Sequence, residues 1–245
     1  FKAGYGVDVT GALTAADYEL LSNITGTPGY PGAATFVTNL NTVQNFYDAI
    51  KAMNLTNRDI VKNVFNIDVS LALDAAMTAR IQTLLGGTTI PIVTGALIKV
   101  GELYDTLKTL GIGYQTFFET IFPPVTLADG ITTKAEYDAM IGVVTGQNGT
   151  YVYTDGATFA QALIKNKDLV DAVIAGGAAV EAAFKAGYGV DVTAPLTIAD
   201  YELLSGITGT LGYPGAATFV ANINLVAALD AQLTALNLRA DFETL

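Results

Sequence analysis

The chain has 245 residues, of which 51% are hydrophobic and 14% are charged, so it can bury a sizeable core and does not have the composition of a disordered protein. Lysine and arginine number 12 against 23 aspartate and glutamate, a net charge of -11, and such an acidic surface repels the phosphates of nucleic acids and of anionic lipids. The absence of cysteine and histidine excludes disulfides, thiolate nucleophiles and the commonest general base, and we expect neither an enzyme nor a bound cofactor.

The first predicted helix begins after Thr14. The run Thr14-Ala-Ala-Asp17 fits a capping box, in which the threonine hydroxyl accepts from the N–H three residues on and the acid reaches back. Gly26 closes this helix, and a Gly/Pro turn follows over 26–32. A longer helix is predicted from Ala33 to Met53, because its apolar residues form one stripe at Phe36, Leu40, Val43, Tyr47 and Ile50.

Further helices are predicted along the middle of the chain, each ended by glycine or proline. They cover 69–85, 91–110, 115–122 and 158–175, and another starts at Thr56-Asn-Arg-Asp59. Strand signals are sparse: 150–154 is the best candidate, and 7–9 could pair briefly with 190–192. The fold class we expect is mostly α, a multi-helix repeat architecture with short helices, Gly/Pro turns and at most a few short strands.

A tandem repeat is the strongest signal in the sequence. Residues 1–40 return at 184–223, an offset of 183, and the opening ten residues are identical. Roughly four positions in five match across the forty, which indicates duplication. A weaker third copy covers 131–163, with Thr133-Lys-Ala-Glu136 as its capping pattern. We expect no copy within 56–130.

The repeat suggests a division of the chain into three parts. A helical unit over 1–128 contains the first copy, a shorter divergent unit covers 129–183, and the second near-identical copy starts at 184 and runs to 245. The second copy spans 62 residues of a 183-residue period (184–245), so we expect a window of a longer array. The alternative is a complete chain with a frayed first segment.

Aromatic residues recur with the repeat and are candidates for an interface. A tyrosine follows each capping pattern, and further rings lie in or after each Gly/Pro turn. The rings in or after the turns could line a groove for a cell-surface glycan, although packing within the core or the turn is the favoured alternative. The candidates are Tyr18, Tyr137 and Tyr201, together with Tyr30, Tyr213, Phe36 and Phe219.

Acidic residues give weak candidates for a calcium site. Asp8 and Asp191 lie in the glycine-rich run Gly-Tyr-Gly-Val-Asp-Val-Thr, which lacks the spacing of a phosphate-binding loop or an EF-hand. A plain backbone turn is the favoured interpretation, with calcium as the alternative. The acid pairs that flank Tyr18, Tyr137 and Tyr201 are similarly expected to cap helices.

The Thr-, Ala- and Gly-rich, cysteine-free, acidic composition resembles that of bacterial and archaeal surface-layer proteins and large secreted adhesins. This resemblance implies a self-assembling extracellular protein of the cell surface, a subunit of a lattice, sheath or filament or a repeat region of an adhesin, whose partner is itself. No run of about 18 uninterrupted apolar residues occurs, so no membrane span is expected. The alternatives are a glycan- or protein-binding module and a carboxylate-dependent hydrolase, for which the sequence offers no acid pair.

Overall fold

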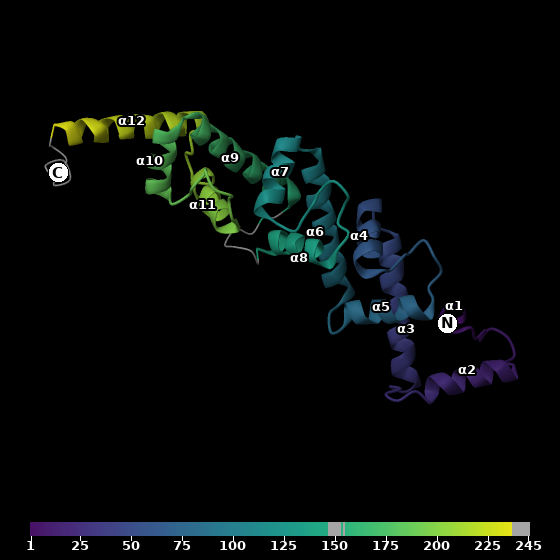
Figure 1. Cartoon of the computed structure of the whole chain (residues 1–245). Coiled ribbons are helices and arrows are strands. Elements are labelled where there is room, and N and C mark those ends of the chain that lie inside the picture. The colour runs from purple at the N-terminus through teal and green to yellow at the C-terminus, as the bar shows by residue number, and fades with distance from the viewer. Residues whose placement is uncertain (147–152, 154, 237–245) are drawn as a thin grey trace. The chain divides into compact units, whose positions relative to one another are not determined.

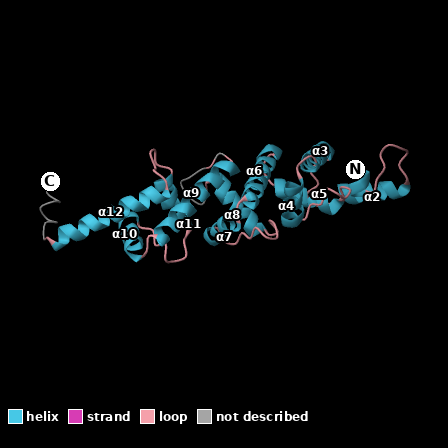
Figure 2. Ribbon diagram, turned by 90° about the horizontal axis from the view of Figure 1, so that it is seen from above, coloured by secondary structure: helices cyan, strands magenta, loops and turns pink. Residues whose placement is uncertain are grey.

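The computed structural model describes residues 1–146, 153 and 155–236, and every regular element among them is a helix (Figures 1 and 2). The predicted mostly-α architecture is confirmed. The helices are α1 (Lys2–Tyr5), α2 (Ala15–Thr25), α3 (Ala33–Lys51), α4 (Leu55–Phe65), α5 (Ala75–Leu85), α6 (Ile90–Thr109), α7 (Ile112–Ile121), α8 (Lys134–Thr145), α9 (Gly156–Ala175), α10 (Ala178–Tyr188), α11 (Ile198–Thr208) and α12 (Ala216–Ala235).

Packing divides the chain into two compact units. An N-terminal unit comprises 1–101 and 128–137, and a C-terminal unit comprises 102–127 and 138–245. These boundaries follow contacts in space, whereas the division expected at 128 and 183 follows the repetition of sequence. That sequence division stays a prediction.

The helices follow one pattern along the chain, a three-helix module that occurs four times. In the second, third and fourth modules, a helix of 10 or 11 residues precedes one of 11 or 12 and then one of 20. The first module has a four-residue α1 before helices of 11 and 19 residues. The second helices start at 15, 75, 134 and 198, so the modules recur after 60, 59 and 64 residues.

The expectation that 56–130 holds no copy is therefore wrong, since α4–α6 are a second module. This module has the same helices and turns as the near-identical copies, but different residues form them. Asn66 ends α4 with a φ of 54°, where Gly6 and Gly189 end α1 and α10 at 75° and 76°. Asparagine is the residue after glycine that best tolerates this left-handed backbone, so the same turn survives without its glycine.

The loop after each first helix carries two apolar residues separated by one. They are Val7 and Val9, Ile67 and Val69, Val125 and Leu127, and Val190 and Val192, and all except Val9 are buried. The prediction of strands at 7–9 and 190–192 is therefore wrong. These segments are loops, and their buried valines pack among the helices. The strand expected at 150–154 lies outside the described residues, except for Tyr153.

Two helix starts differ from the predictions for a local reason. Asn54, not Thr56, caps α4, since its side chain accepts from the N–H of Asn57. The predicted helix at 69 begins only at Ala75, because Asp68 accepts from the N–H and hydroxyl of Ser70 and holds the preceding segment as a turn.

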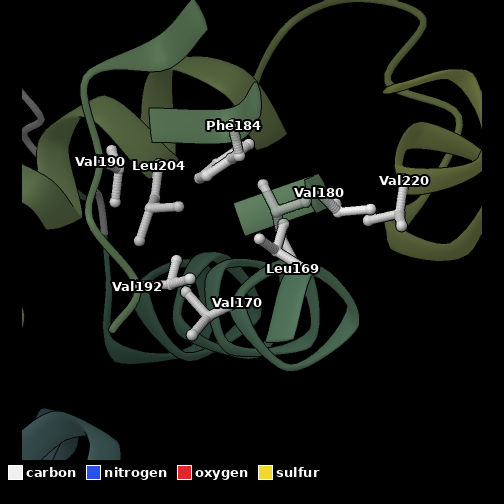
Figure 3. Close-up of a cluster of buried hydrophobic side chains, with 9 residues drawn as sticks. Leu169, Val170, Val180, Phe184, Val190, Val192, Leu204 and Val220 are labelled. Atoms are coloured by element: carbon white, nitrogen blue, oxygen red, sulfur yellow. The ribbon is translucent and has the colours of Figure 1, made fainter. Parts of the chain in front are cut away.

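The core of the C-terminal unit lies among the last four helices. It is formed by Leu169, Val170 and Val173 of α9, Val180 and Phe184 of α10, Val190 and Val192 of the following loop, Leu204 of α11 and Val220 of α12. Figure 3 shows the side chains of α9 facing those of α10 and α11 and the loop between them. One helix therefore closes the apolar face of the module that follows it.

Candidate functional site: the junction between modules

The third helix of one module packs on the next module, and this junction is the feature that the structure repeats. Helix α3 contacts α4 and α5, and helix α9 contacts α10, α11 and α12. When the third helices are aligned by their first residues, the same four positions are buried in α3, α6 and α9, except that Tyr104 is half-buried. They are Val43, Phe46, Tyr47 and Ile50 in α3, Val100, Leu103, Tyr104 and Leu107 in α6, and Asn166, Leu169, Val170 and Val173 in α9.

Hydrogen bonds fix two junctions at the same place. The Tyr47 hydroxyl donates to the carbonyls of Val69 and Leu71, at 3.2 and 2.6 Å. The Tyr104 hydroxyl donates to the carbonyl of Leu127 at 3.2 Å. Val69 and Leu127 hold the same place in the loop after a first helix, so a tyrosine of the third helix meets the same backbone atom in both junctions.

The junction of α9 with the fourth module uses a buried asparagine instead. Asn166 is fully buried, and its amide nitrogen donates to the Ser205 hydroxyl at 2.8 Å. The Thr208 hydroxyl donates to the Asn166 amide oxygen at 2.6 Å. Because both ends of the amide are bonded, the desolvation of a buried polar group is offset, and the three residues fix the register of α9 on α11.

Tyr201 completes this junction. Its ring lies 5.8 Å from that of Phe159 in α9, 5.3 Å from that of Phe122, and its hydroxyl lies 3.3 Å from that of Tyr153. Burial raises the pKa of Tyr201 far above its ordinary value. This phenol is therefore a neutral packing group.

The three tyrosines of the capping motif have different surroundings. Tyr137 is buried with its ring edge-on to Phe65 at 5.1 Å, and Tyr201 is 3% exposed, whereas Tyr18 is 61% exposed. The capping boxes themselves form: Thr14 pairs with Asp17, Thr197 with Asp200, and Thr133 with Glu136. The acids of these motifs bond to their own helix starts.

The aromatic residues of the Gly/Pro turn form the same cluster in both near-identical copies. Phe36 lies 5.6 Å from Tyr5 and 5.8 Å from Tyr30, and Phe219 lies 5.3 Å from Tyr188 and 5.9 Å from Tyr213. The turns border hollows of about 750 and 520 Å³, lined by Tyr30 and Phe36 in one and by Tyr213 in the other. These rings pack on one another, and four of them, Tyr5, Tyr30, Phe36 and Tyr213, also line the hollows.

Asp8 and Asp191, the calcium candidates, each bind a lysine six residues earlier and a threonine two residues later. Asp8 accepts from Lys2 and Thr10, and Asp191 accepts from Lys185 and Thr193. The ammonium of Lys185 and the Thr193 hydroxyl lower the pKa of Asp191 from 3.8 to about 2. Among the described residues, no three acidic side chains gather as metal ligands would, so an ion at Asp8 or Asp191 would have to displace the lysine.

The sequence reasoning named Tyr201 but not Asn166, Ser205 or Thr208. A signal was present, since Ser22 and Thr25 repeat at 205 and 208, but a serine and a threonine on a short helix do not reveal a partner 40 residues away. In comparisons with known proteins, no family model, no curated sequence and no solved structure matches the chain.

Proposed function

We propose that the protein is a structural, self-assembling component of the cell surface, in which one module-to-module junction is used repeatedly. One observation carries the proposal: two helix faces that inner modules bury are exposed elsewhere in the chain. The extracellular location is proposed from the resemblance of the acidic, Thr-, Ala- and Gly-rich, cysteine-free composition to that of surface-layer proteins. Repetition of one interface suits lattices and filaments, because a contact between unlike faces continues from copy to copy.

The first exposed face lies on α12. Its junction positions, by alignment with α3, are Val226, Leu229, Asp230 and Leu233. Val226 is 67% and Leu229 46% exposed, whereas the counterparts Val43 and Phe46 are at most 1% exposed. Exposed apolar stripes of this kind mark interaction surfaces. The second exposed face lies on the first module, where Val9, Tyr18 and Val37 are all more than half exposed.

Helix α12 has a second property that bears on this role. Among the described helices it is long and apolar enough to cross a membrane by length and composition, as are α5 and α6 if a pair bent by 89° is taken as one span. Its counterpart α3 has the same register and is a core helix that contacts α4 and α5. The apolar stripe of α12 is thus explained as a junction surface, and we propose no membrane span.

A binding function is the second candidate, because a hollow borders the Gly/Pro turn in both near-identical copies, with residues 82–88 as its other wall in the first and Lys165 and Asp168 in the second. Tyr30 and Tyr213 line these hollows at equivalent positions. Aromatic rings bordering a hollow suit the apolar faces of sugars. A glycan array screened with the intact chain, and with Tyr30→Ala and Tyr213→Ala, tests this role.

Self-association of the intact chain tests the leading proposal. We expect light scattering and negative-stain electron microscopy to show ordered oligomers that increase with protein concentration. Salt should promote them, since screening reduces the repulsion between chains of net charge -11. Leu229→Asp should reduce association at least about tenfold, because a buried unpaired charge costs several kcal/mol.

A matched control is available on the same helix. Leu225 is 70% exposed, but its counterparts in the other third helices are the polar residues Thr42, Lys99 and Lys165, so Leu225→Asp should leave association unchanged. Dispersed monomers at all concentrations and salt levels, with and without calcium, would contradict the proposal. Equal effects of the two variants would contradict the role of the junction stripe.

A further inference from the structure

The second copy of the repeat shows what covers the first. The surface that α9 covers on the fourth module includes Val192, Tyr201, Leu204, Ser205, Thr208 and Val220. At an offset of 183, the first module carries the identical residues, which we call the open face: Val9, Tyr18, Leu21, Ser22, Thr25 and Val37. Both copies also form the same capping box, lysine–aspartate pair and aromatic cluster.

The exposures of the two surfaces differ widely although their residues do not. Val9 is 59% exposed against 8% for Val192, Tyr18 is 61% against 3% for Tyr201, and Val37 is 53% against 7% for Val220. A hollow of about 490 Å³ borders the open face and is lined by Val9, Leu21 and Val37. The difference arises because α9 packs on α10, α11 and α12, whereas among the described helices α5 contacts only α1 and α3 of the first module and none packs extensively on α2.

The polar residues of the open face give it a specific partner. In the covered copy, Ser205 and Thr208 bond to the two ends of the Asn166 amide. Ser22 and Thr25 hold the same places on α2 and are exposed. A hydroxyl pair set into an apolar surface favours a partner with a matching amide, because that amide bonds Ser22 and replaces the 3.3 Å contact that the Thr25 hydroxyl makes with the Ser22 carbonyl of its own helix.

We infer that the open face is a binding site for a helix with the pattern of α9. The pattern is an aromatic residue to stack on Tyr18, an asparagine seven residues later to bond Ser22 and Thr25, and aliphatic residues three, four and seven positions beyond it, as in Phe159, Asn166, Leu169, Val170 and Val173. The inference rests on the proposed function and deepens it, because it identifies the segment that joins one repeat to the next.

The α12 helix of a second copy is a poorer occupant of this site. At the asparagine position it has Val226, which cannot bond the hydroxyls of Ser22 and Thr25. At the position of Val170 it has Asp230, which would bring a carboxylate into an apolar contact. Self-association of this chain through α12 and the open face is therefore weaker than binding of a helix with the pattern of α9, which supplies the asparagine.

The test uses the intact chain and a synthetic peptide of residues 155–177, acetylated and amidated, with binding followed by fluorescence anisotropy. We expect saturable binding at one site, without nonspecific binding that varies with salt concentration. A peptide with Asn166→Leu keeps the size of the side chain and loses both hydrogen bonds, and it should bind about tenfold more weakly or worse. Equal affinity of the two peptides would overturn the inference.

Variants of the chain locate the site. Val9→Asp and Val37→Asp lie on the open face and should abolish binding while the fold stays intact, because both side chains are largely exposed. Leu20→Asp is the control on the same helix as Tyr18, since Leu20 and its counterpart Leu203 are 39% and 47% exposed, and it should bind normally. Binding that survives both open-face variants would overturn the inference.

The peptide assay tests the inference and the assembly assay tests the proposed function, so a negative result in one can be distinguished from a negative result in the other. If the peptide does not bind while chains associate through α12, the open face has another occupant and the inference is overturned, with the proposed function retained. If the peptide binds and chains remain monomeric, the site is supported and the assembly role falls.

Discussion

Tyr201→Ala should destabilise the C-terminal unit by about 3–5 kcal/mol, the range for removing a buried aromatic ring, whereas Tyr18→Ala should change stability by no more than about 0.5 kcal/mol. The two tyrosines sit in the same local sequence, Ala-Asp-Tyr-Glu-Leu-Leu-Ser. Tyr201 loses ring contacts with Phe159 and Phe122 when truncated, and Tyr18 is 61% exposed. Chemical denaturation followed by circular dichroism of the helical signal measures both changes.

This pair of variants isolates tertiary packing from local propensity. The capping box and the residues from two before the tyrosine to four after it are the same at both sites, so most of the local contribution cancels in the comparison. A loss at Tyr18 equal to that at Tyr201 would mean that the two copies are equally covered. The open face would then not exist in solution.

The second large effect is expected at the buried asparagine. Asn166→Val should cost about 2–4 kcal/mol, because the hydroxyls of Ser205 and Thr208 lose the amide that bonds them inside the core. The double variant Asn166→Val with Thr208→Val should cost less than the sum of the two single changes, since it removes both partners of one hydrogen bond. Denaturation of the three variants completes the cycle.

The first junction shows why we expect the double variant to be tolerated. There the positions of Asn166 and Thr208 are occupied by Val43 and Leu85, both buried. An apolar pair thus fills the same geometry without hydrogen bonds. Strict additivity of the two single changes would contradict the coupling that the 2.6 Å contact between Thr208 and Asn166 implies.

Much of the fold could be predicted from sequence because its signals are local. The capping boxes at Thr14 and Thr197, the glycines that close α2 and α11, and the apolar stripe of α3 all act within a few residues. The second module could not be recognised from the sequence because different residues form the same turns and ion pair. Asn66 replaces a glycine, Ser70 replaces a threonine, and the pair of Lys62 with Asp68 keeps the six-residue spacing.

The candidate site was less predictable than the fold. Periodicity places Asn166 on the inner face of α9 but does not say what meets it, because its partners lie 39 and 42 residues further along the chain. The difference in exposure between Tyr18 and Tyr201 also cannot be predicted from the sequence. The two residues have the same local sequence, and their exposure differs only because a neighbouring helix covers Tyr201. Both properties belong to the junction rather than to either module.

Hydrogen exchange measured at several protein concentrations tests the central claim most directly, because α2 and α11 have nearly the same sequence and report on the open and covered faces. The account predicts strong protection of α11 at every concentration, weak protection of α2 in dilute solution, and a rise in α2 protection as chains associate or as the 155–177 peptide is added. Equal protection of α2 and α11 in dilute solution, or protection of α2 that stays low in assembled protein, would contradict it.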